Sequence, residues 1–227
     1  MMGEHELRSR LKLYFVMGSV NCARRPAAEV LKEAIRGGVT MFQYREKGPG
    51  ALKGAQKYEL GAALRQVCRK SGIPFIVNDD AELALRLDAD GIHIGQEDAP
   101  VEEIRRRIGG MILGVSAHDP EEARAALERG ADYLGVGPMY LTATKPDARA
   151  VRGPSVIRAI RECGASAPLV GIGGIRQGNA LPVIEAGADG VAVISAIGTA
   201  RDVDGAARQL ISEIKGGIYH VDRTKNQ

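Results

Sequence analysis

The sequence is poor in aromatic residues, which make up 4% of its 227 residues and include no tryptophan. Proteins that bind single-stranded nucleic acid need aromatic platforms on which bases stack, and this composition offers few of them. Charge of one sign is also not in excess, because 31 lysines and arginines stand against 28 aspartates and glutamates for a net charge of +3. So small a net charge does not indicate the strongly basic surface that nucleic-acid binding usually requires. We therefore expect no nucleic-acid partner.

Long hydrophobic runs and paired cysteines are lacking as well. No run of about 18 or more apolar residues is present, and residues 1–10 lack the apolar stretch of a signal peptide. The three cysteines, Cys22, Cys68 and Cys163, are far apart and have no metal-ligand spacing. A disulfide framework and a structural zinc site are both disfavoured by this pattern. We predict a cytoplasmic protein with no membrane partner, whose cysteines have structural positions.

Short apolar or β-branched runs alternate with longer segments of helical period along the chain. The predicted strands are residues 11–17, 39–45, 74–78, 91–95, 111–116, 133–137, 169–172 and 190–194. Helical patterns between them cover residues 27–36, 55–70, 101–108, 120–129, 154–161 and 180–186. Eight β-α units in this length predict an α/β fold, the (β/α)8 TIM barrel. A doubly wound open sheet is the alternative, although it usually has fewer strands and an identifiable switch point.

The chain shows no linker, low-complexity tract or block of like charge that would divide it. We therefore predict a single TIM-barrel domain over residues 1–227, with the barrel at about residues 11–216. Short polar tails are expected at both ends. The short sequence Gly-Ala-Asp recurs at residues 130–132 and 187–189, where it is interpreted as a repeated turn between helix and strand.

Polar side chains gather where the predicted strands end, which is the end of a TIM barrel that carries its chemistry. The second strand ends in Gln43-Tyr44-Arg45-Glu46-Lys47. Alternation along a strand places Gln43, Arg45 and Lys47 on one side and Tyr44 and Glu46 on the other. Arginine and lysine in a barrel mouth require an anionic partner. That partner is either a carboxylate of a neighbouring strand or a phosphate or pyrophosphate ligand.

Two clusters of carboxylates follow the third and fourth strands, Asn78-Asp79-Asp80 and Gly95-Gln96-Glu97-Asp98. The spacing between them leaves room for one helix, which returns both clusters to the same end of the barrel. Asp79 and Asp98 are interpreted as ligands of a Mg²⁺ ion that bridges the protein to a phosphorylated substrate. Each aspartate could instead cap a helix, and we assign Asp80 to such a cap.

The fifth strand ends in Ser116-Ala117-His118. We interpret Ser116 as a substrate contact, not a nucleophile. His118 is interpreted as a hydrogen-bonded structural residue, because no acid stands at a spacing that would identify a catalytic triad.

The loops after the sixth, seventh and eighth strands have features of phosphate binding. The segment 135–146, after the sixth strand, is longer than the barrel requires, and it carries Thr142, Thr144 and Lys145 close together in sequence. A solvated polar loop is the alternative. Glycines at residues 171–174 and the segment 194–197 follow the strands whose loops commonly form a barrel's phosphate site.

Taken together, these motifs resemble those of the thiamine-phosphate synthase family, from about residue 12 to about residue 214. The resemblance rests on seven segments in the same order, at residues 43–47, 78–80, 93–98, 114–118, 142–145, 172–175 and 193–197. It implies a transferase of thiamine biosynthesis. Its substrates are 4-amino-2-methyl-5-(diphosphooxymethyl)pyrimidine and thiazole phosphate, and its products are thiamine phosphate and pyrophosphate. The implied reaction is dissociative and Mg²⁺-assisted.

The resemblance also implies roles by position. Asp79 and Asp98 would hold Mg²⁺. The pyrimidine diphosphate would be bound by Gln43, Tyr44, Arg45, Glu46, Lys47, Asn78, Ser116 and Lys145. The thiazole phosphate would be held by Thr142, Ala143, Thr144, Gly174, Ile194 and Ser195. The expected catalytic residues are Arg45, Lys47, Ser116 and Lys145.

One departure from the family pattern is Leu141, where proline usually precedes the first threonine of the loop. The change removes a restraint on φ and puts loop rigidity in question. Two alternative functions remain open. One is a thiazole tautomerase of the same barrel family, which needs neither Mg²⁺ nor a diphosphate site, and the other is a non-catalytic sensor of a phosphorylated ligand. The sequence leaves the oligomeric state open, and a homo-oligomer is one candidate.

Overall fold

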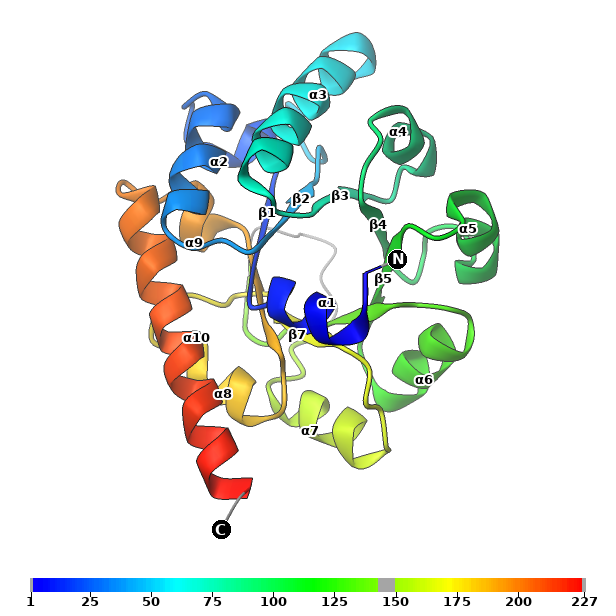
Figure 1. The fold of residues 1–227 in the computed structure, drawn as a ribbon, viewed down its shortest axis with the longest axis vertical. Coiled ribbons are helices and arrows are strands. Elements are labelled where there is room, and N and C mark those ends of the chain that lie inside the picture. The colour runs from blue at the N-terminus through cyan, green and yellow to red at the C-terminus, as the bar shows by residue number, and fades with distance from the viewer. Residues whose placement is uncertain (1, 143–149, 226–227) are drawn as a thin grey trace.

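Eight parallel strands form a closed barrel at the centre of the molecule (Figure 1). The computed structural model describes residues 2–142 and 150–225. The strands are β1 (Leu13–Met17), β2 (Met41–Tyr44), β3 (Phe75–Asn78), β4 (Gly91–Ile94), β5 (Ile112–Ala117), β6 (Tyr133–Val136), β7 (Leu169–Ile172) and β8 (Gly190–Val193). Each strand pairs with the next along the chain, and β8 closes the barrel against β1. The predicted single-domain (β/α)8 fold is confirmed.

Helices surround the barrel (Figure 1). They are α2 (Ala27–Arg36), α3 (Gly54–Ser71), α4 (Ala81–Arg86), α5 (Val101–Ile108), α6 (Pro120–Glu128), α7 (Ser155–Glu162), α8 (Leu181–Glu185) and α10 (Val203–Lys225). Two short helices, η1 (Ser19–Asn21) and α9 (Ser195–Gly198), follow β1 and β8, and α1 (Glu4–Arg10) precedes β1. No helix in the described part of the chain is long and apolar enough to cross a membrane.

Local sequence signals explain several of these boundaries. Asp119 caps α6 by accepting a hydrogen bond of 2.9 Å from the Glu122 N–H, and Pro120 occupies the first helical position. Gly130 follows α6 with φ of +100°, a left-handed conformation that favours glycine. These signals place α6 within one residue of its predicted end.

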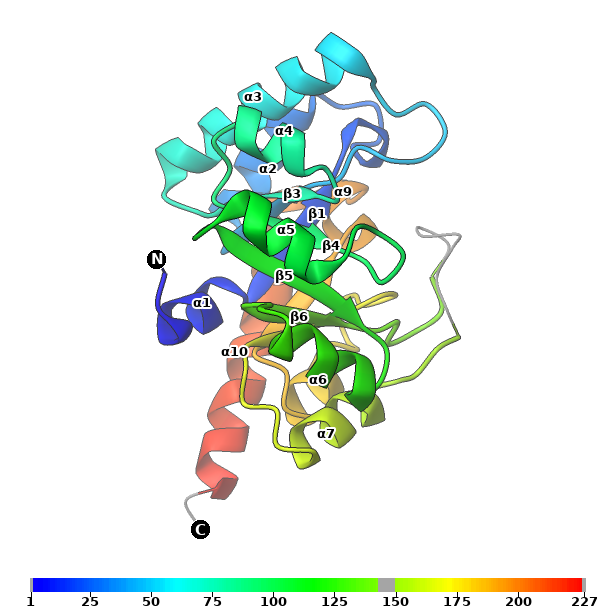
Figure 2. The same cartoon turned by 90° about the vertical axis from the view of Figure 1, so that its right-hand side faces the viewer.

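The short polar tail predicted at the N-terminus is corrected to helix α1. Leu7 in this helix and Leu11 at its C-cap stand four residues apart, so they lie on one side of the helix, and both are buried. They pack with barrel-interior residues such as Tyr14, Met41 and Ile76. Helix α1 therefore closes the end of the barrel opposite the carboxyl ends of the strands (Figure 2).

The C-terminal tail is likewise corrected, because α10 continues past residue 216 to Lys225. Its buried residues follow helical spacing and are Val203, Ala207, Leu210, Ile211 and Ile214. Figure 1 shows α10 running beside α2 and α8, against which it packs. The apolar side of this helix completes the outer layer between the first and last β-α units.

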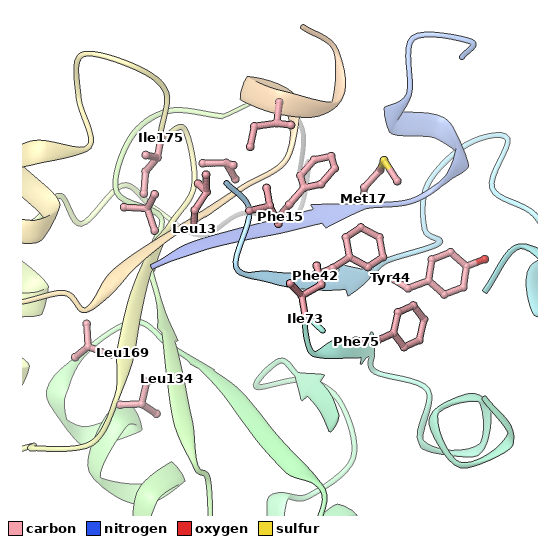
Figure 3. Close-up of a cluster of buried hydrophobic side chains, with 14 of the residues drawn as sticks. Leu13, Phe15, Met17, Phe42, Tyr44, Ile73, Phe75, Leu134, Leu169 and Ile175 are labelled. Carbon is pink, nitrogen blue, oxygen red and sulfur yellow. The ribbon is translucent and has the colours of Figure 1, made fainter. Parts of the chain in front are cut away.

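The largest core lies between the sheet and the surrounding helices (Figure 3). Phe15, Phe42 and Phe75 from three successive strands point outward into it, with ring centroids 5.9 Å apart for the first pair and 6.0 Å for the second. Aromatic pairs at such separations add to the stabilisation given by burial alone. A second buried cluster fills the inside of the barrel and contains two tyrosines, Tyr14 and Tyr133.

A repeated hydrogen-bond motif ties each odd-numbered strand to the next even-numbered one at the N-terminal end of the barrel. An aspartate just before β4, β6 or β8 accepts from a backbone N–H at the start of the preceding strand. The pairs are Asp90 with Phe75 (2.7 Å), Asp132 with Leu113 (2.7 Å) and Asp189 with Leu169 (2.9 Å). Arg65, Arg105 and Arg161 form ion pairs with these aspartates. In the first unit Thr40 Oγ1 takes the same place and accepts from the Leu13 N–H at 2.9 Å.

Candidate active site

The carboxyl ends of the strands surround a cavity of about 690 Å³. This volume lies within the range of roughly 300 to 1,000 Å³ that is typical of small-molecule sites. The structure brings many of the predicted residues to its wall, namely Arg45, Lys47, Asn78, Asp79, Asp98, Ser116, Thr142, Gly174, Ile194 and Ser195. Residues from seven different strand ends therefore line one cavity.

Asp79 and Asp98 lie side by side at the ends of β3 and β4. Asp79 has φ of +61°, a left-handed conformation that aspartate tolerates better than most residues, and its N–H donates to the His93 carbonyl at 2.8 Å. Asp98 Oδ2 accepts from the Gly95 N–H at 2.7 Å, which fixes the turn after β4. Burial and the adjacent Asp79 carboxylate raise the pKa of Asp98. The two carboxylates are therefore close enough to repel each other.

Positive charge reaches this carboxylate pair from the end of β2. Lys47 forms an ion pair with Asp79, while its side chain stays 49% exposed. Arg45 lines the same part of the cavity, and so does the Asn78 amide. Within the described residues, the side chains of Arg45 and Asn78 have no hydrogen-bond partner. These groups are available to an anionic ligand.

Asp80 is a helix cap, as predicted. Its Oδ1 accepts from the Leu83 N–H at 2.9 Å at the start of α4, and its Oδ2 accepts from Lys57 Nζ at 2.8 Å. Burial acts to raise the pKa of Asp80, but these two hydrogen bonds outweigh burial and the pKa is lowered. Asp98 does not cap α5, since Pro100 holds the N-cap position.

Three predicted substrate contacts, Gln43, Tyr44 and Glu46, do not reach the cavity wall. Gln43 points into the barrel interior, where its Nε2 donates to the Tyr14 hydroxyl at 2.8 Å. Tyr44 points outward and donates to the Lys57 carbonyl at 2.9 Å.

Glu46 is also turned away from the cavity. Its carboxylate accepts from the N–H groups of Ser19 and Leu52, both at 2.8 Å, and so joins the loops after β1 and β2. The alternation predicted along residues 43–47 therefore holds. Gln43 faces the barrel interior, whereas Tyr44 and Glu46 face away from it.

Histidine residues at the cavity wall were only partly anticipated. His118 has the structural role predicted for it, since its Nδ1 lies 2.7 Å from Glu122 Oε2 at the start of α6. His93 was not predicted as a site residue. Its Nε2 lies 3.1 Å from Ser116 Oγ, and Gln96 Nε2 donates to the Ser116 carbonyl at 2.5 Å.

The other end of the cavity is formed by the loops after β6, β7 and β8. Gly173 and Gly174 have φ of +97° and +66°, and a Cβ on Gly174 would lie 2.6 Å from the Leu141 carbonyl oxygen. Only glycine fits there, and the backbone is left open to a ligand. Ile194 and Ser195 approach from the end of β8.

Arg176 adds a cation near this glycine pair and was not predicted, although it follows Gly174 by only two residues. Leu141, which stands in place of the usual proline, is 87% exposed at the rim. The predicted contacts Ala143, Thr144 and Lys145 lie outside the described residues.

The fold and the cavity define the class of protein: a (β/α)8 barrel with a cavity of small-molecule size at the carboxyl ends of its strands. A family model described as thiamine monophosphate synthase matches residues 13–197. The chain therefore belongs to the thiamine monophosphate synthase family.

Individual relatives agree with this assignment. Over 210 residues the chain is 58% identical to thiamine-phosphate synthase of Geobacillus kaustophilus and 55% identical to that of Geobacillus thermodenitrificans. Both alignments cover 92% of this chain and 95% of the relative. Among solved structures, a thiamine phosphate pyrophosphorylase from Pyrococcus furiosus is 39% identical, with a TM-score of 0.84 over 93% of this chain and 99% of that one.

These similarities carry the activity of the family to the chain, which is a transferase of thiamine biosynthesis that acts on small-molecule substrates. The tautomerase and the non-catalytic sensor are not favoured. A tautomerase would have no use for Arg45, Lys47, Asp79 and Asp98, and a sensor would be expected to have an incomplete set of these charged residues. The structure brings all four together.

Proposed function

We propose that the chain joins 4-amino-2-methyl-5-(diphosphooxymethyl)pyrimidine to thiazole phosphate, with release of pyrophosphate. The observation that carries this assignment is the division of the cavity. Arg45, Lys47 and the two carboxylates lie at one end, and the glycine loop with Ser195 lies at the other. The cationic end suits the diphosphate leaving group, and the glycine-loop end suits the phosphate of the acceptor.

The reaction we propose is dissociative. The bond between the methylene carbon and the diphosphate oxygen breaks, and the electron pair departs with pyrophosphate. The thiazole nitrogen then donates its lone pair to the pyrimidine-methyl cation and forms the new C–N bond. No protein nucleophile is required, so catalysis depends on stabilising the leaving charge and on positioning.

Arg45 and Lys47 are assigned to the diphosphate, where a guanidinium offers a two-pronged donor and an ammonium a point charge. Asn78 is assigned to a phosphate oxygen beside them. Ser116 is assigned to the pyrimidine side of the cavity. Lys145 keeps its expected place with the diphosphate on the strength of the sequence resemblance alone.

Thr142, Gly174, Ile194 and Ser195 are assigned to the thiazole phosphate. Backbone N–H groups after the last two strands of a barrel commonly bind phosphate, which supports this placement. Ala143 and Thr144 retain the same assignment from the resemblance. Gln43, Tyr44 and Glu46 hold the segment that carries Arg45 and Lys47, as their hydrogen bonds indicate.

Asp79 and Asp98 fit a divalent cation, and we propose Mg²⁺. Both offer hard oxygen donors. Burial and the neighbouring Asp79 carboxylate raise the pKa of Asp98, and a cation between the two carboxylates would relieve their repulsion. Within the described residues no group of three or more His, Cys, Asp and Glu side chains gathers as a metal site. A site with two protein carboxylates suits Mg²⁺, which usually keeps water and substrate phosphate as its other ligands. When bound, the ion would supply positive charge to the departing pyrophosphate.

The setting we propose is the cytoplasm. Support comes from the free state of Cys22, Cys68 and Cys163, which suits a reducing compartment. The possibility of a homo-oligomer raised by the sequence stays a proposal.

The direct test is an assay of the purified protein with both substrates and Mg²⁺. We expect pyrophosphate and thiamine phosphate to form in equal amounts. Omission of thiazole phosphate should abolish thiamine phosphate formation. If folded protein released no pyrophosphate and made no thiamine phosphate under these conditions, the assignment would be overturned.

A further inference from the structure

A chain of hydrogen bonds runs from the barrel interior to the wall of the cavity. Gln43 Nε2 lies 2.8 Å from the Tyr14 hydroxyl, which lies 2.8 Å from the Tyr133 hydroxyl. The Tyr133 hydroxyl lies 3.0 Å from His93 Nδ1, and His93 Nε2 lies 3.1 Å from Ser116 Oγ. Five side chains from five strands thus connect the core to a residue that faces the substrate.

Which atom donates in each of these hydrogen bonds follows from the number of protons that each group carries. The Gln43 amide nitrogen can only donate, so the Tyr14 oxygen accepts from it. Within the described residues the Tyr14 hydroxyl has only Gln43 and Tyr133 as partners, so its single proton is donated to Tyr133. Tyr133 has only Tyr14 and His93 as partners there, and its proton is donated to His93 Nδ1.

His93 Nδ1 therefore accepts a hydrogen bond and carries no proton. A neutral imidazole must then hold its proton on Nε2, which donates to Ser116 Oγ. Because Ser116 Oγ accepts from His93, the serine proton is directed elsewhere. Ser116 lines the cavity and is partly buried, so the cavity is where that proton can find an acceptor.

The barrel interior has room for this series of hydrogen-bonded side chains. Tyr14 and Tyr133 are fully buried among apolar side chains of the barrel interior, with ring centroids 6.0 Å apart. A Cβ on Gly114 would overlap both Tyr133 and His93, and a Cβ on Gly135 would lie 2.9 Å from His93 Cε1. Two glycines thus make room for two polar rings. Buried polar groups are tolerated when every member of the network is satisfied, as these are.

We propose that Tyr133 is a positioning residue that fixes the Nε2-protonated tautomer of His93 and thereby makes Ser116 a hydrogen-bond donor to an acceptor atom of the substrate. The proposal deepens the proposed function, because it takes Ser116 as the substrate contact on the pyrimidine side. It assigns Tyr14 a different role, because Tyr14 has no contact with His93 in this series of hydrogen bonds. Tyr14 only donates a hydrogen bond to the Tyr133 hydroxyl.

The first test measures the tautomer without any assay of activity. Two-bond proton–nitrogen spectra of ¹⁵N-labelled protein show which ring nitrogen of each histidine is protonated, and His93→Gln identifies the His93 signals among the four histidines. We expect the proton on Nε2. A proton on Nδ1 would show that the chain runs in the opposite direction and would overturn the proposal, whether or not the protein makes thiamine phosphate.

Two matched variants separate the roles of the tyrosines. Tyr133→Phe keeps the ring and removes the donor to Nδ1, so we expect the Nδ1-protonated form of His93 to appear. Tyr14→Phe leaves Tyr133 with His93 as its only acceptor in the chain, so the Nε2 form should persist. An unchanged His93 spectrum in folded Tyr133→Phe protein would overturn the proposal.

A double-mutant cycle tests whether the effect passes through Ser116. We expect Tyr133→Phe to lower kcat/KM about tenfold, the size of effect that loss of one hydrogen bond commonly has. In a Ser116→Ala background the same change should have almost no further effect, because its target is gone. Equal losses in both backgrounds would show that Tyr133 acts only on the fold. If the protein had no such activity at all, the proposed function would fail while the tautomer test would still stand.

Discussion

Lys47 and Asp79 form an ion pair across the ends of β2 and β3, so a residue assigned to the diphosphate touches a residue assigned to the metal. The lysine ammonium supplies the positive charge that this carboxylate requires in the structure. Because its side chain remains half exposed, the ammonium can turn toward a bound diphosphate without a change in the core. In the assignment we propose, the pair therefore links the diphosphate site to the carboxylate pair.

Lys47→Met tests this link. We expect kcat/KM for the pyrimidine diphosphate to fall about 100-fold, because loss of one preorganised charge contact commonly costs that much. The free energy of unfolding should change little, since an exposed ion pair contributes about 0 to 1 kcal/mol. Arg69→Met, at an exposed position on α3, is the matched control and should keep full activity. Equal kinetics for both variants would remove Lys47 from the diphosphate site.

Asp98→Asn tests the metal site. The change removes one of two adjacent carboxylates whose repulsion helps to raise the pKa of Asp98, so the fold should be at least as stable. The Mg²⁺ concentration for half-maximal pyrophosphate release should rise at least about tenfold, a loss that even the partners of metal ligands commonly cause. Asp88→Asn, a side chain 97% exposed, is the control. An unchanged Mg²⁺ requirement in Asp98→Asn would exclude Asp98 as a ligand.

Much of the fold was predictable because its signals are local. The bounds of α2, α5 and β7 match the prediction, since each combines a clear hydrophobic period with glycine or proline at its ends. Helix α1 was missed because it has only seven residues and one buried side chain, Leu7. Its stability depends on contacts with the barrel interior, which no local pattern reveals.

Position on the cavity wall was predictable where a residue's type and its place at a strand end were enough, as for Asp79 and Asp98. His93 was missed because it lies within β4 between Ile92 and Ile94 and looks like an ordinary strand residue. Its role depends on Tyr133 and Ser116, which only the closed barrel brings beside it. Long-range contacts of this kind are set by topology, not by spacing along the chain.

Asp189 joins three parts of the N-terminal end of the barrel. Its carboxylate accepts from the Leu169 N–H at 2.9 Å, from Arg161 at 2.9 Å and from Arg8 of helix α1 at 2.6 Å. Asp189→Asn should lower the free energy of unfolding by about 1 to 3 kcal/mol, because two charge-assisted hydrogen bonds weaken. Urea unfolding measures the change, and Asp88→Asn should shift it by less than about 0.5 kcal/mol. Similar values for the two variants would contradict a structural role for this repeated motif.

The cysteines should differ sharply in reactivity. Cys163 is exposed after α7, whereas Cys22 and Cys68 are fully buried. Burial, with a smaller effect from the Glu46 carboxylate, raises the pKa of Cys22 from 9.0 to about 11. A disulfide reagent at pH 8 should therefore label one thiol in the folded protein and three after denaturation. Rapid labelling of all three thiols in folded protein would contradict this arrangement.

The same shift in the pKa of Cys22 predicts a dependence of stability on pH. The folded protein holds the Cys22 proton more tightly than the unfolded chain does, so ionisation favours unfolding. The contribution is therefore fully present below about pH 9 and is lost as the pH rises toward 11. Cys22→Ala removes this titration, and its free energy of unfolding should fall less steeply over that range than that of the unchanged protein.

Gly114 on β5 should tolerate no side chain. A Cβ there would overlap Tyr133 and the His93 ring, both held by hydrogen bonds and unable to move without breaking the chain to Ser116. Gly114→Ala should lower the free energy of unfolding by about 1 to 3 kcal/mol through overpacking and should also reduce turnover. Gly216→Ala is the matched control, because a Cβ there meets no atom within 4 Å and glycine inside helix α10 is itself unfavourable. That variant should be about 0.5 to 1 kcal/mol more stable. Thermal unfolding and an activity assay on both variants decide the matter: a Gly114→Ala protein with unchanged stability and turnover would mean that the barrel interior can shift to accept the methyl group.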